Sequence, residues 1–149
     1  MSAAPTGVAA PIDYDPQLAA RLDWDKGGGL VPAIVQHAVS GAVLMLGYMN
    51  REALAATLER RRAVFYSRSR QRLWEKGETS GHTQRVVEMR IDCDQDAVWI
   101  KVEQVAGACH TGRRSCFYRS VPLGQKGGAV TLELRDERVF DPKAVYDKP

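Results

Sequence analysis

The sequence predicts a single α+β domain with a mainly antiparallel sheet and one principal helix. Segments 85–92 and 97–105 alternate apolar and polar side chains, which is typical of half-buried strands. Segments 30–36 and 42–48 are also strand-like and flank a Ser-Gly turn signal, so they predict a hairpin. Segment 51–61 has helical spacing, and one helix among several short strands indicates the α+β class.

The predicted helix has a recognisable start and end. Asn50 is a good N-cap residue, and Leu54 and Leu58 lie four positions apart on one face. The arginines at 60–62 suit the negative end of the helix dipole, and we interpret them as a solvated helix terminus. A short strand is expected next, at 63–67.

The remaining segments are predicted from turn signals and residue alternation. Residues 68–84 have no clean period and predict a long loop, a kind of segment that is usually functional or disordered. Residues 93–96 are the expected tight turn between the two alternating strands. A second loop is expected at 107–112, a last strand at 115–121 and an additional strand at 130–134.

Composition and charge exclude several classes of protein. The chain has 149 residues, of which 44% are hydrophobic and 26% charged, as in one globular domain. No apolar run reaches the ~18 residues of a membrane helix, and residues 1–16 lack the features of a signal peptide. We therefore expect a cytoplasmic protein with no membrane partner. The net charge of +3 is too small to indicate nucleic-acid binding by itself.

Three cysteines form the first candidate site. Fifteen residues separate Cys93 from Cys109, and six more separate Cys109 from Cys116, which is not the paired CxxC spacing of a zinc finger. Three thiolates indicate an open zinc site, whereas buried free cysteines are the simpler alternative. Cys109 lies in the polar, glycine-flanked stretch GACHTG, which is a poor place for a core thiol. The adjacent His110 could be a fourth ligand or a general base.

Three carboxylates at alternate positions, Asp92, Asp94 and Asp96, form the second candidate site. Oxygen ligands favour Mg²⁺ or Ca²⁺, and the alternative is a solvated acidic turn. An EF-hand is rejected because the turn glycine is missing and the flanking segments are strand-like. Strand alternation puts Cys93 on the face opposite Asp92 and Asp94. The tip of this hairpin could therefore serve two different metals or two subunits.

The predicted loop 68–84 is the third candidate site, because it combines the hydrogen-bond donors that a phosphate group requires with an aromatic surface for a base. His82, in the same loop, is a second candidate acid/base. The candidate substrate-binding residues are Arg68, Ser69, Arg70, Trp74, Lys76, Thr79, Ser80 and Gly81.

Five stretches together resemble the phosphoribosyl-AMP cyclohydrolase family, over roughly residues 23–119. They are LVPAIVQ, VLMLGYMNREAL, FYSRSRQRLWEKGETSGHTQ, IDCDQDA and VEQVAGACHTGRRSCFYR. The resemblance implies hydrolysis of the N1–C6 bond of the adenine ring of 1-(5-phosphoribosyl)-AMP, giving a formimino-aminoimidazole carboxamide ribonucleotide. This is the third step of histidine biosynthesis. It also implies a partly open, barrel-like antiparallel sheet.

The resemblance further implies a homodimer with two metals. Cys93 matches a zinc ligand from one subunit, and Cys109 and Cys116 match ligands from its partner. The aspartates at 92, 94 and 96 match magnesium ligands. Zinc would lower the pKa of a bound water molecule toward ~7, and His110, with His82, would move the proton to the ring.

The resemblance also divides the chain. We expect a mobile N-terminal arm at 1–22, a cyclohydrolase domain at 23–121 and a C-terminal extension at 122–149. The segment after residue 119, about thirty residues, is too short for the pyrophosphohydrolase domain found in some family members, so the monofunctional form is expected.

Two other functions compete with the hydrolase. A zinc-stabilised nucleic-acid-binding module is supported by the pI of about 8.9, the arginines between 60 and 72, and Trp74 as a stacking surface. The acidic run at 92–96 and the missing CxxC pairs argue against it, so no nucleic-acid partner is expected. A base deaminase would need an HxE…PCxxC pattern, which this sequence lacks.

Overall fold

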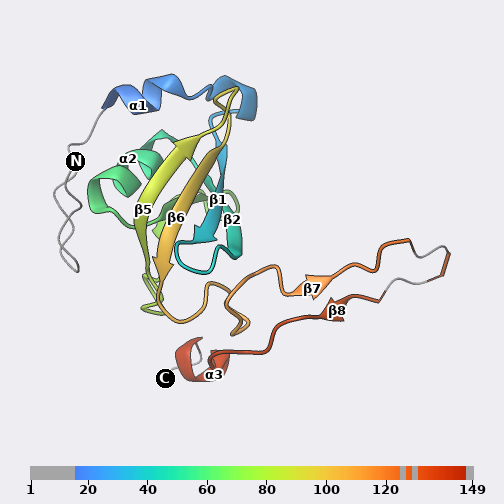
Figure 1. Cartoon of the computed structure of the whole chain (residues 1–149). Helices are drawn as coiled ribbons and strands as arrows, with labels where there is room; N and C mark the ends of the chain where they lie inside the picture. The colour runs from blue at the N-terminus through green and yellow to red at the C-terminus, as the bar shows by residue number, and fades with distance from the viewer. Residues whose placement is uncertain (1–15, 125–126, 129–130, 147–149) are drawn as a thin grey trace.

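The computed structural model describes residues 16–124, 127–128 and 131–146 (Figure 1). Residues 1–15 of the predicted N-terminal arm, and Val130 of the predicted strand 130–134, lie outside the described residues. The elements are α1 (Pro16–Arg21), η1 (Asp25–Gly27), β1 (Val31–His37), β2 (Val43–Met49), α2 (Arg51–Arg60), β3 (Val64–Ser67), β4 (Arg72–Glu75), β5 (Gln84–Ile91), β6 (Val98–Gln104), β7 (Arg119–Ser120), β8 (Glu133–Leu134) and α3 (Pro142–Tyr146). None of the described helices is long and apolar enough to cross a membrane.

The main sheet has four strands in the order β2-β1-β6-β5. Both predicted hairpins, β1–β2 and β5–β6, are present as antiparallel pairs. The hairpins are joined by a parallel pairing of β1 with β6, in which Ala33 lies opposite Val98. Strand β1 alternates between the buried Val31, Ala33 and Val35 and the exposed Ile34, so one face of this sheet forms the core.

Helix α2 confirms the predicted helix and its N-cap. The Asn50 side chain accepts a hydrogen bond of 2.8 Å from the Ala53 amide. At the other end of the helix, the buried Thr57 hydroxyl donates to the Ala53 carbonyl and accepts from the Val64 amide. Thr57 therefore fixes α2 to the start of β3, with its one buried hydroxyl fully bonded.

The prediction of a loop over residues 68–84 was wrong for Arg72–Glu75, because these residues form strand β4. This strand pairs antiparallel with β3, so that Trp74 lies opposite Phe65. The Trp74 and Phe65 ring centroids are 5.2 Å apart, and the buried Phe65 anchors the hairpin to the core. The hairpin is a separate two-stranded sheet, which gives the residues that follow it a rigid support.

The barrel-like sheet and the last strand at 115–121 also need correction. The described residues form one four-stranded and two two-stranded sheets, with no closed barrel. Only Arg119–Ser120 is a strand, β7, and it pairs with β8 in an arm that projects from the body (Figure 1). Ser115 and Cys116 instead bond to the start of β2: the Ser115 hydroxyl donates to Val43 and the Cys116 amide to Leu44.

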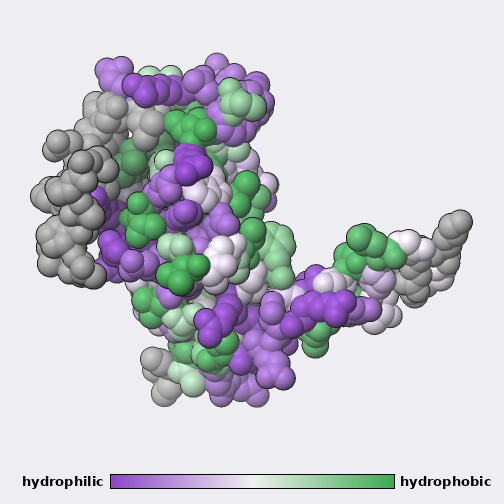
Figure 2. All heavy atoms as spheres, viewed as in Figure 1, coloured by the Kyte–Doolittle hydropathy of each residue, from purple (hydrophilic) through white to green (hydrophobic). Residues whose placement is uncertain are grey.

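The arm formed by β7 and β8 carries apolar side chains on its surface (Figure 2). Val121, Leu123 and Leu134 are each more than half exposed. The β7–β8 arm and α3 follow the end of β6, whereas the β5–β6 turn lies at the opposite end of the main sheet, beside η1 (Figure 1). Predicted site residues thus lie at both ends of the main sheet: the aspartates and Cys93 in the β5–β6 turn, and Cys109, His110 and Cys116 after the end of β6.

Candidate functional site

A cavity of about 590 Å³ lies beside the β3–β4 hairpin and the Cys109 loop. It gathers residues from the predicted phosphate-binding segment and from the cysteine-histidine segment, which are far apart in the sequence. The predicted site residues that line it are Ser69, Arg70, Trp74, Lys76, Thr79, Ser80, His110 and Cys116.

Lys76 joins the two sides of this cavity. Its side chain is buried, and its ammonium group donates a hydrogen bond of 2.6 Å to the carbonyl of Ala108. Burial lowers the pKa of Lys76, while the neighbouring thiols of Cys116 and Cys109 act in the opposite direction. The charge of Lys76 acts in turn to lower the pKa of Cys116, against the larger effect of burial on that thiol.

Two of the three predicted zinc ligands lie together. Cys109 is buried, with its sulfur 2.9 Å from the Thr111 hydroxyl, and Cys116 lines the cavity. Partial burial of the Cys116 thiol, followed by the neighbouring Cys109, raises its pKa to about 12. Two thiols supply half of the tetrahedral ligand set that zinc requires, so the pair fits zinc if a further ligand comes from elsewhere.

The third predicted ligand, Cys93, is at the opposite end of the sheet. It is exposed in the β5–β6 turn, whereas Cys109 and Cys116 follow the far end of β6 (Figure 1). Strand β6, which lies between Cys93 and the other two cysteines along the chain, has seven residues and a length of roughly 20 Å. The three cysteines of one subunit are therefore not brought together.

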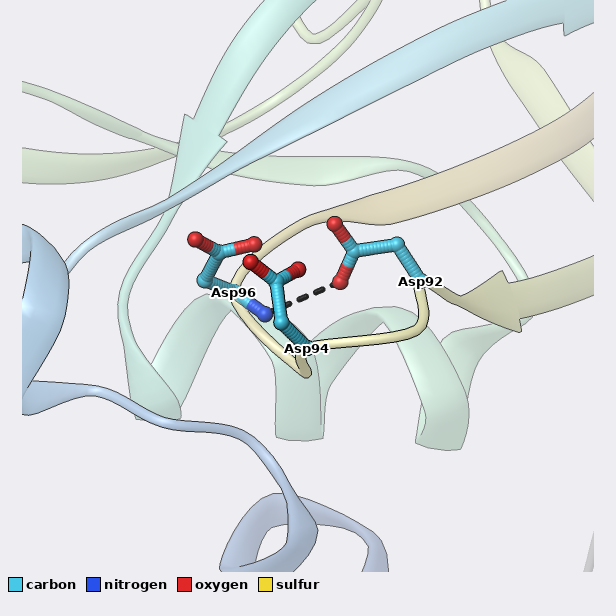
Figure 3. Close-up of side chains that lie close together, drawn as sticks. All are labelled: Asp92, Asp94 and Asp96. Carbon is cyan, nitrogen blue, oxygen red and sulfur yellow. Dashed lines mark hydrogen bonds between the residues drawn. The ribbon is translucent and has the colours of Figure 1, made fainter.

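The three aspartates form a compact cluster in the same turn as Cys93 (Figure 3). Their carboxylates all lie within 4.8 Å of one another. Asp92 accepts hydrogen bonds from the amides of Asp96 and Ala97, at 2.9 and 3.1 Å, which fixes its orientation. The ammonium group of Lys26 lies 3.2 Å from Asp94 and 3.6 Å from Asp96.

The neighbouring groups shift the pKa values of Asp96 and Asp94 in opposite directions. Hydrogen bonds to Asp94 and Asp92 raise the pKa of Asp96, while hydrogen bonds with Asp96 and then with Lys26 lower the pKa of Asp94. The Lys26 ammonium group therefore supplies a positive charge beside the carboxylates of Asp94 and Asp96. Three oxygen ligands with a partly neutralising lysine fit a hard divalent cation such as Mg²⁺.

The two predicted catalytic histidines differ in position. His110 is exposed and lines the cavity. His82 does not line it; its ring packs edge-on against Phe140, with centroids 4.5 Å apart. Burial, and then the nearby charge of Lys76, lowers the pKa of His82, while a hydrogen bond with the Gly107 backbone opposes the shift. The Nδ1 atom of His82 is buried without a hydrogen-bond partner.

The other predicted substrate residues lie beside the cavity. The guanidinium of Arg68 is 3.9 Å from the ring centre of Tyr48. Arg68 lines a second hollow of about 500 Å³, which shares Ser69 and Trp74 with the first. Gly81 lies in the turn after β4, where its amide donates to the Gly77 carbonyl.

Sequence reasoning missed several residues that line the cavity. Glu75 and Glu78 lie within the predicted loop but were passed over, because acidic side chains do not suit a phosphate site. Met45 belongs to a strand assigned only to the core, and Tyr146 lies in the C-terminal extension, where no motif pointed to a site.

Comparison with known proteins gives the same family as the resemblance. A family model described as phosphoribosyl-AMP cyclohydrolase matches residues 45–118. A protein of that name from Rhodopseudomonas palustris (strain ATCC BAA-98 / CGA009) is 54% identical over 140 residues, which are 93% of this chain and 92% of the relative. A second, from Bradyrhizobium sp. (strain ORS 278), is 58% identical over 120 residues, covering 80% of this chain and 92% of the relative.

A third relative with the same name extends the similarity to nearly the whole sequence. The protein from Nitrobacter hamburgensis is 51% identical over 147 residues, which are 99% of this chain and 95% of the relative. Identity at this level over most of both chains indicates common ancestry and a common fold. The chain belongs to the phosphoribosyl-AMP cyclohydrolase family.

Proposed function

We propose that this protein hydrolyses the N1–C6 bond of the adenine ring of 1-(5-phosphoribosyl)-AMP, in the third step of histidine biosynthesis. The observation that carries the proposal is a single cavity lined by both phosphate-type donors and a cysteine-histidine pair. Family membership supports the same reaction. A nucleotide hydrolase of this kind acts on a small molecule in the cytoplasm.

The substrate is a nucleotide with phosphate groups at both ends, and the cavity offers groups for each part. Arg70 supplies a guanidinium group, and Ser69, Thr79 and Ser80 supply hydroxyl donors to phosphate oxygens. Trp74 supplies a flat apolar surface for the base. Arg68, in the adjoining hollow, would bind a phosphate that extends beyond the cavity.

The thiols of Cys109 and Cys116 would hold zinc together with Cys93 of a second copy of the chain. Zinc, when bound, supplies a water acidic enough to lose its proton near neutral pH. His110, at the cavity wall, would take up the proton and pass it to the ring nitrogen, with His82 as an auxiliary group. The Lys76 ammonium group lies beside these thiols, and its charge acts against the effect of burial on Cys116.

A homodimer would complete the zinc site. Cys93 is exposed in the β5–β6 turn and the other two cysteines follow the far end of β6, so a site with all three thiols would need a second copy of the chain. The same turn carries the aspartate cluster, so the second copy would bring Mg²⁺ and Cys93 to the cavity together. Mg²⁺ there would neutralise and orient a substrate phosphate.

The test is ring opening of phosphoribosyl-AMP, followed by ultraviolet absorbance. Turnover that is lost with a zinc chelator, restored by zinc and increased by Mg²⁺ would support the activity and both metals. A Cys116→Ser variant is the matched control, because it removes one thiol from the cavity. No turnover by folded, zinc-loaded protein would contradict the proposal.

A further inference from the structure

The C-terminal strap, residues 136–146, crosses the loop that carries Cys109 and His110. The Val139 amide donates a hydrogen bond of 2.7 Å to the Gly112 carbonyl, and the Arg138 guanidinium donates one of 2.9 Å to the Thr111 carbonyl. From the other side, the Arg113 guanidinium donates to the Asp136 carbonyl at 3.3 Å. These bonds connect the strap to residues 111–113, the end of the loop that follows Cys109 and His110.

The loop has no space for a side chain where the strap crosses it. Gly112 has a φ of +97°, and a Cβ built on it would lie 2.5 Å from the Phe140 carbonyl oxygen. At Gly107, a Cβ would lie 2.6 Å from the Arg113 carbonyl oxygen and 3.1 Å from the Phe140 ring. Gly112 therefore leaves room for the strap, while Gly107 is required mainly by the loop's own backbone.

The strap also continues into the cavity. The Phe140 ring contacts His82 edge-on at 4.5 Å, and the Tyr146 ring lies 6.4 Å beyond that of Phe140. Tyr146, in α3, lines the same cavity as Arg70 and Trp74. The cavity thus has aromatic residues from two distant segments of the chain, together with a cationic side chain.

We propose that the C-terminal strap is a wall of the substrate pocket and that Tyr146 is a specificity-determining residue that contacts the bound nucleotide. The proposal rests on the proposed function for the identity of that nucleotide. A second aromatic surface beside Trp74 and Arg70 suits a flat purine that carries phosphate groups. The strap lies beyond residues 45–118, the part of the chain that the family model matches.

The test compares Tyr146→Ala and Tyr146→Phe with Lys143→Ala, a matched control on the same short helix. Lys143 is exposed and does not line the cavity. Loss of an aromatic surface for a base is expected to raise the KM for phosphoribosyl-AMP in Tyr146→Ala by roughly five- to a hundredfold. The kcat should fall much less, Tyr146→Phe should retain most of the affinity, and Lys143→Ala should match wild type.

A second measurement separates this proposal from the proposed function. Binding of AMP, a nucleotide without the reactive phosphoribosyl group on its ring, is measured by calorimetry for wild type and Tyr146→Ala. Failure of wild type to open phosphoribosyl-AMP would contradict the proposed function. Weaker AMP binding by Tyr146→Ala would still support the proposal that Tyr146 contacts the nucleotide. Equal KM and equal AMP affinity in the two proteins, or no AMP binding by wild type, would overturn the wall.

Discussion

His110 and His82 have different surroundings, and this difference assigns them different roles. His110 is exposed at the cavity, where it can reach both solvent and substrate. We predict that His110→Ala lowers kcat by roughly 10²–10⁴, the usual contribution of a general acid or base, and leaves zinc content unchanged. The control is His37→Ala, because the His37 imidazole accepts from the amides of Val39 and Ser40 and does not line the cavity. A loss below about tenfold in His110→Ala would contradict an acid/base role.

His82 packs against the strap through the ring of Phe140. Its pKa is lowered mainly by burial, and Phe140 covers its ring. We predict that Phe140→Ala raises the pKa of His82 toward the ordinary histidine value, because water then reaches the imidazolium form. A pH titration followed by NMR measures the shift, with Lys143→Ala as the control. An unchanged or lower pKa would contradict this account.

The sign of the corresponding effect on stability follows from the same shift. A lowered pKa means that the folded chain favours neutral His82. The contribution to stability is therefore complete above the histidine pKa of the unfolded chain, and it is lost as the pH falls below that value. In Phe140→Ala this dependence on pH should be weaker.

At the scale of elements, the close approach of β2 to the β3–β4 hairpin decides how well the hairpin packs. A Cβ added to Gly47 would lie 2.5 Å from the buried Phe65 ring. We predict that Gly47→Ala lowers the free energy of unfolding by about 1–3 kcal/mol, because the ring must move in a close-packed core. Gly27→Ala is the control, since a Cβ there meets nothing within 4 Å. Denaturant unfolding measures both, and equal stabilities would contradict the prediction.

The elements that could be predicted from sequence are those with local signals. Helix α2 has its Asn50 cap and apolar spacing, and the segments that form β5 and β6 alternate apolar and polar residues in the sequence. Strand β4 was missed because Arg72–Glu75 is short and partly exposed along its length, so no alternation marks it. The parallel pairing of β1 with β6 has no local signal, because it joins strands some sixty residues apart and depends on the whole core.

At the scale of the whole molecule, the sequence predicted many of the residues that line the cavity, but not how they come together. The basic, hydroxyl-rich segment and the cysteine-histidine loop were each predicted, because each has its own chemistry. Their contact depends on the buried bond between Lys76 and Ala108, which spans 32 positions and has no motif. The strap was missed for the same reason: Tyr146 reaches the cavity through a strap whose bonds to residues 111–113 have no local sequence signal.

The separation of Cys93 from Cys109 and Cys116 leads to a test of the shared metal site. Cys93→Ser and Cys116→Ser should each be inactive alone, because each lacks one thiol in every site. Co-expressed, the two variants form mixed dimers in which one site has all three cysteines. With random pairing, half of the dimers are mixed and each has one of its two sites intact, so about a quarter of wild-type turnover and zinc content should return.

The control pair for this experiment is Cys109→Ser with Cys116→Ser. Both residues belong to the same side of the site, since their thiols are neighbours in one chain. No mixed dimer of these two variants has both thiols in one subunit, so activity should stay absent. Recovery with the control pair, or none with Cys93→Ser and Cys116→Ser, would contradict a zinc site shared between two copies. Recovery with Cys93→Ser and Cys116→Ser, and none with the control pair, would mean that the turn carrying Cys93 and the aspartates reaches the cavity of the other subunit.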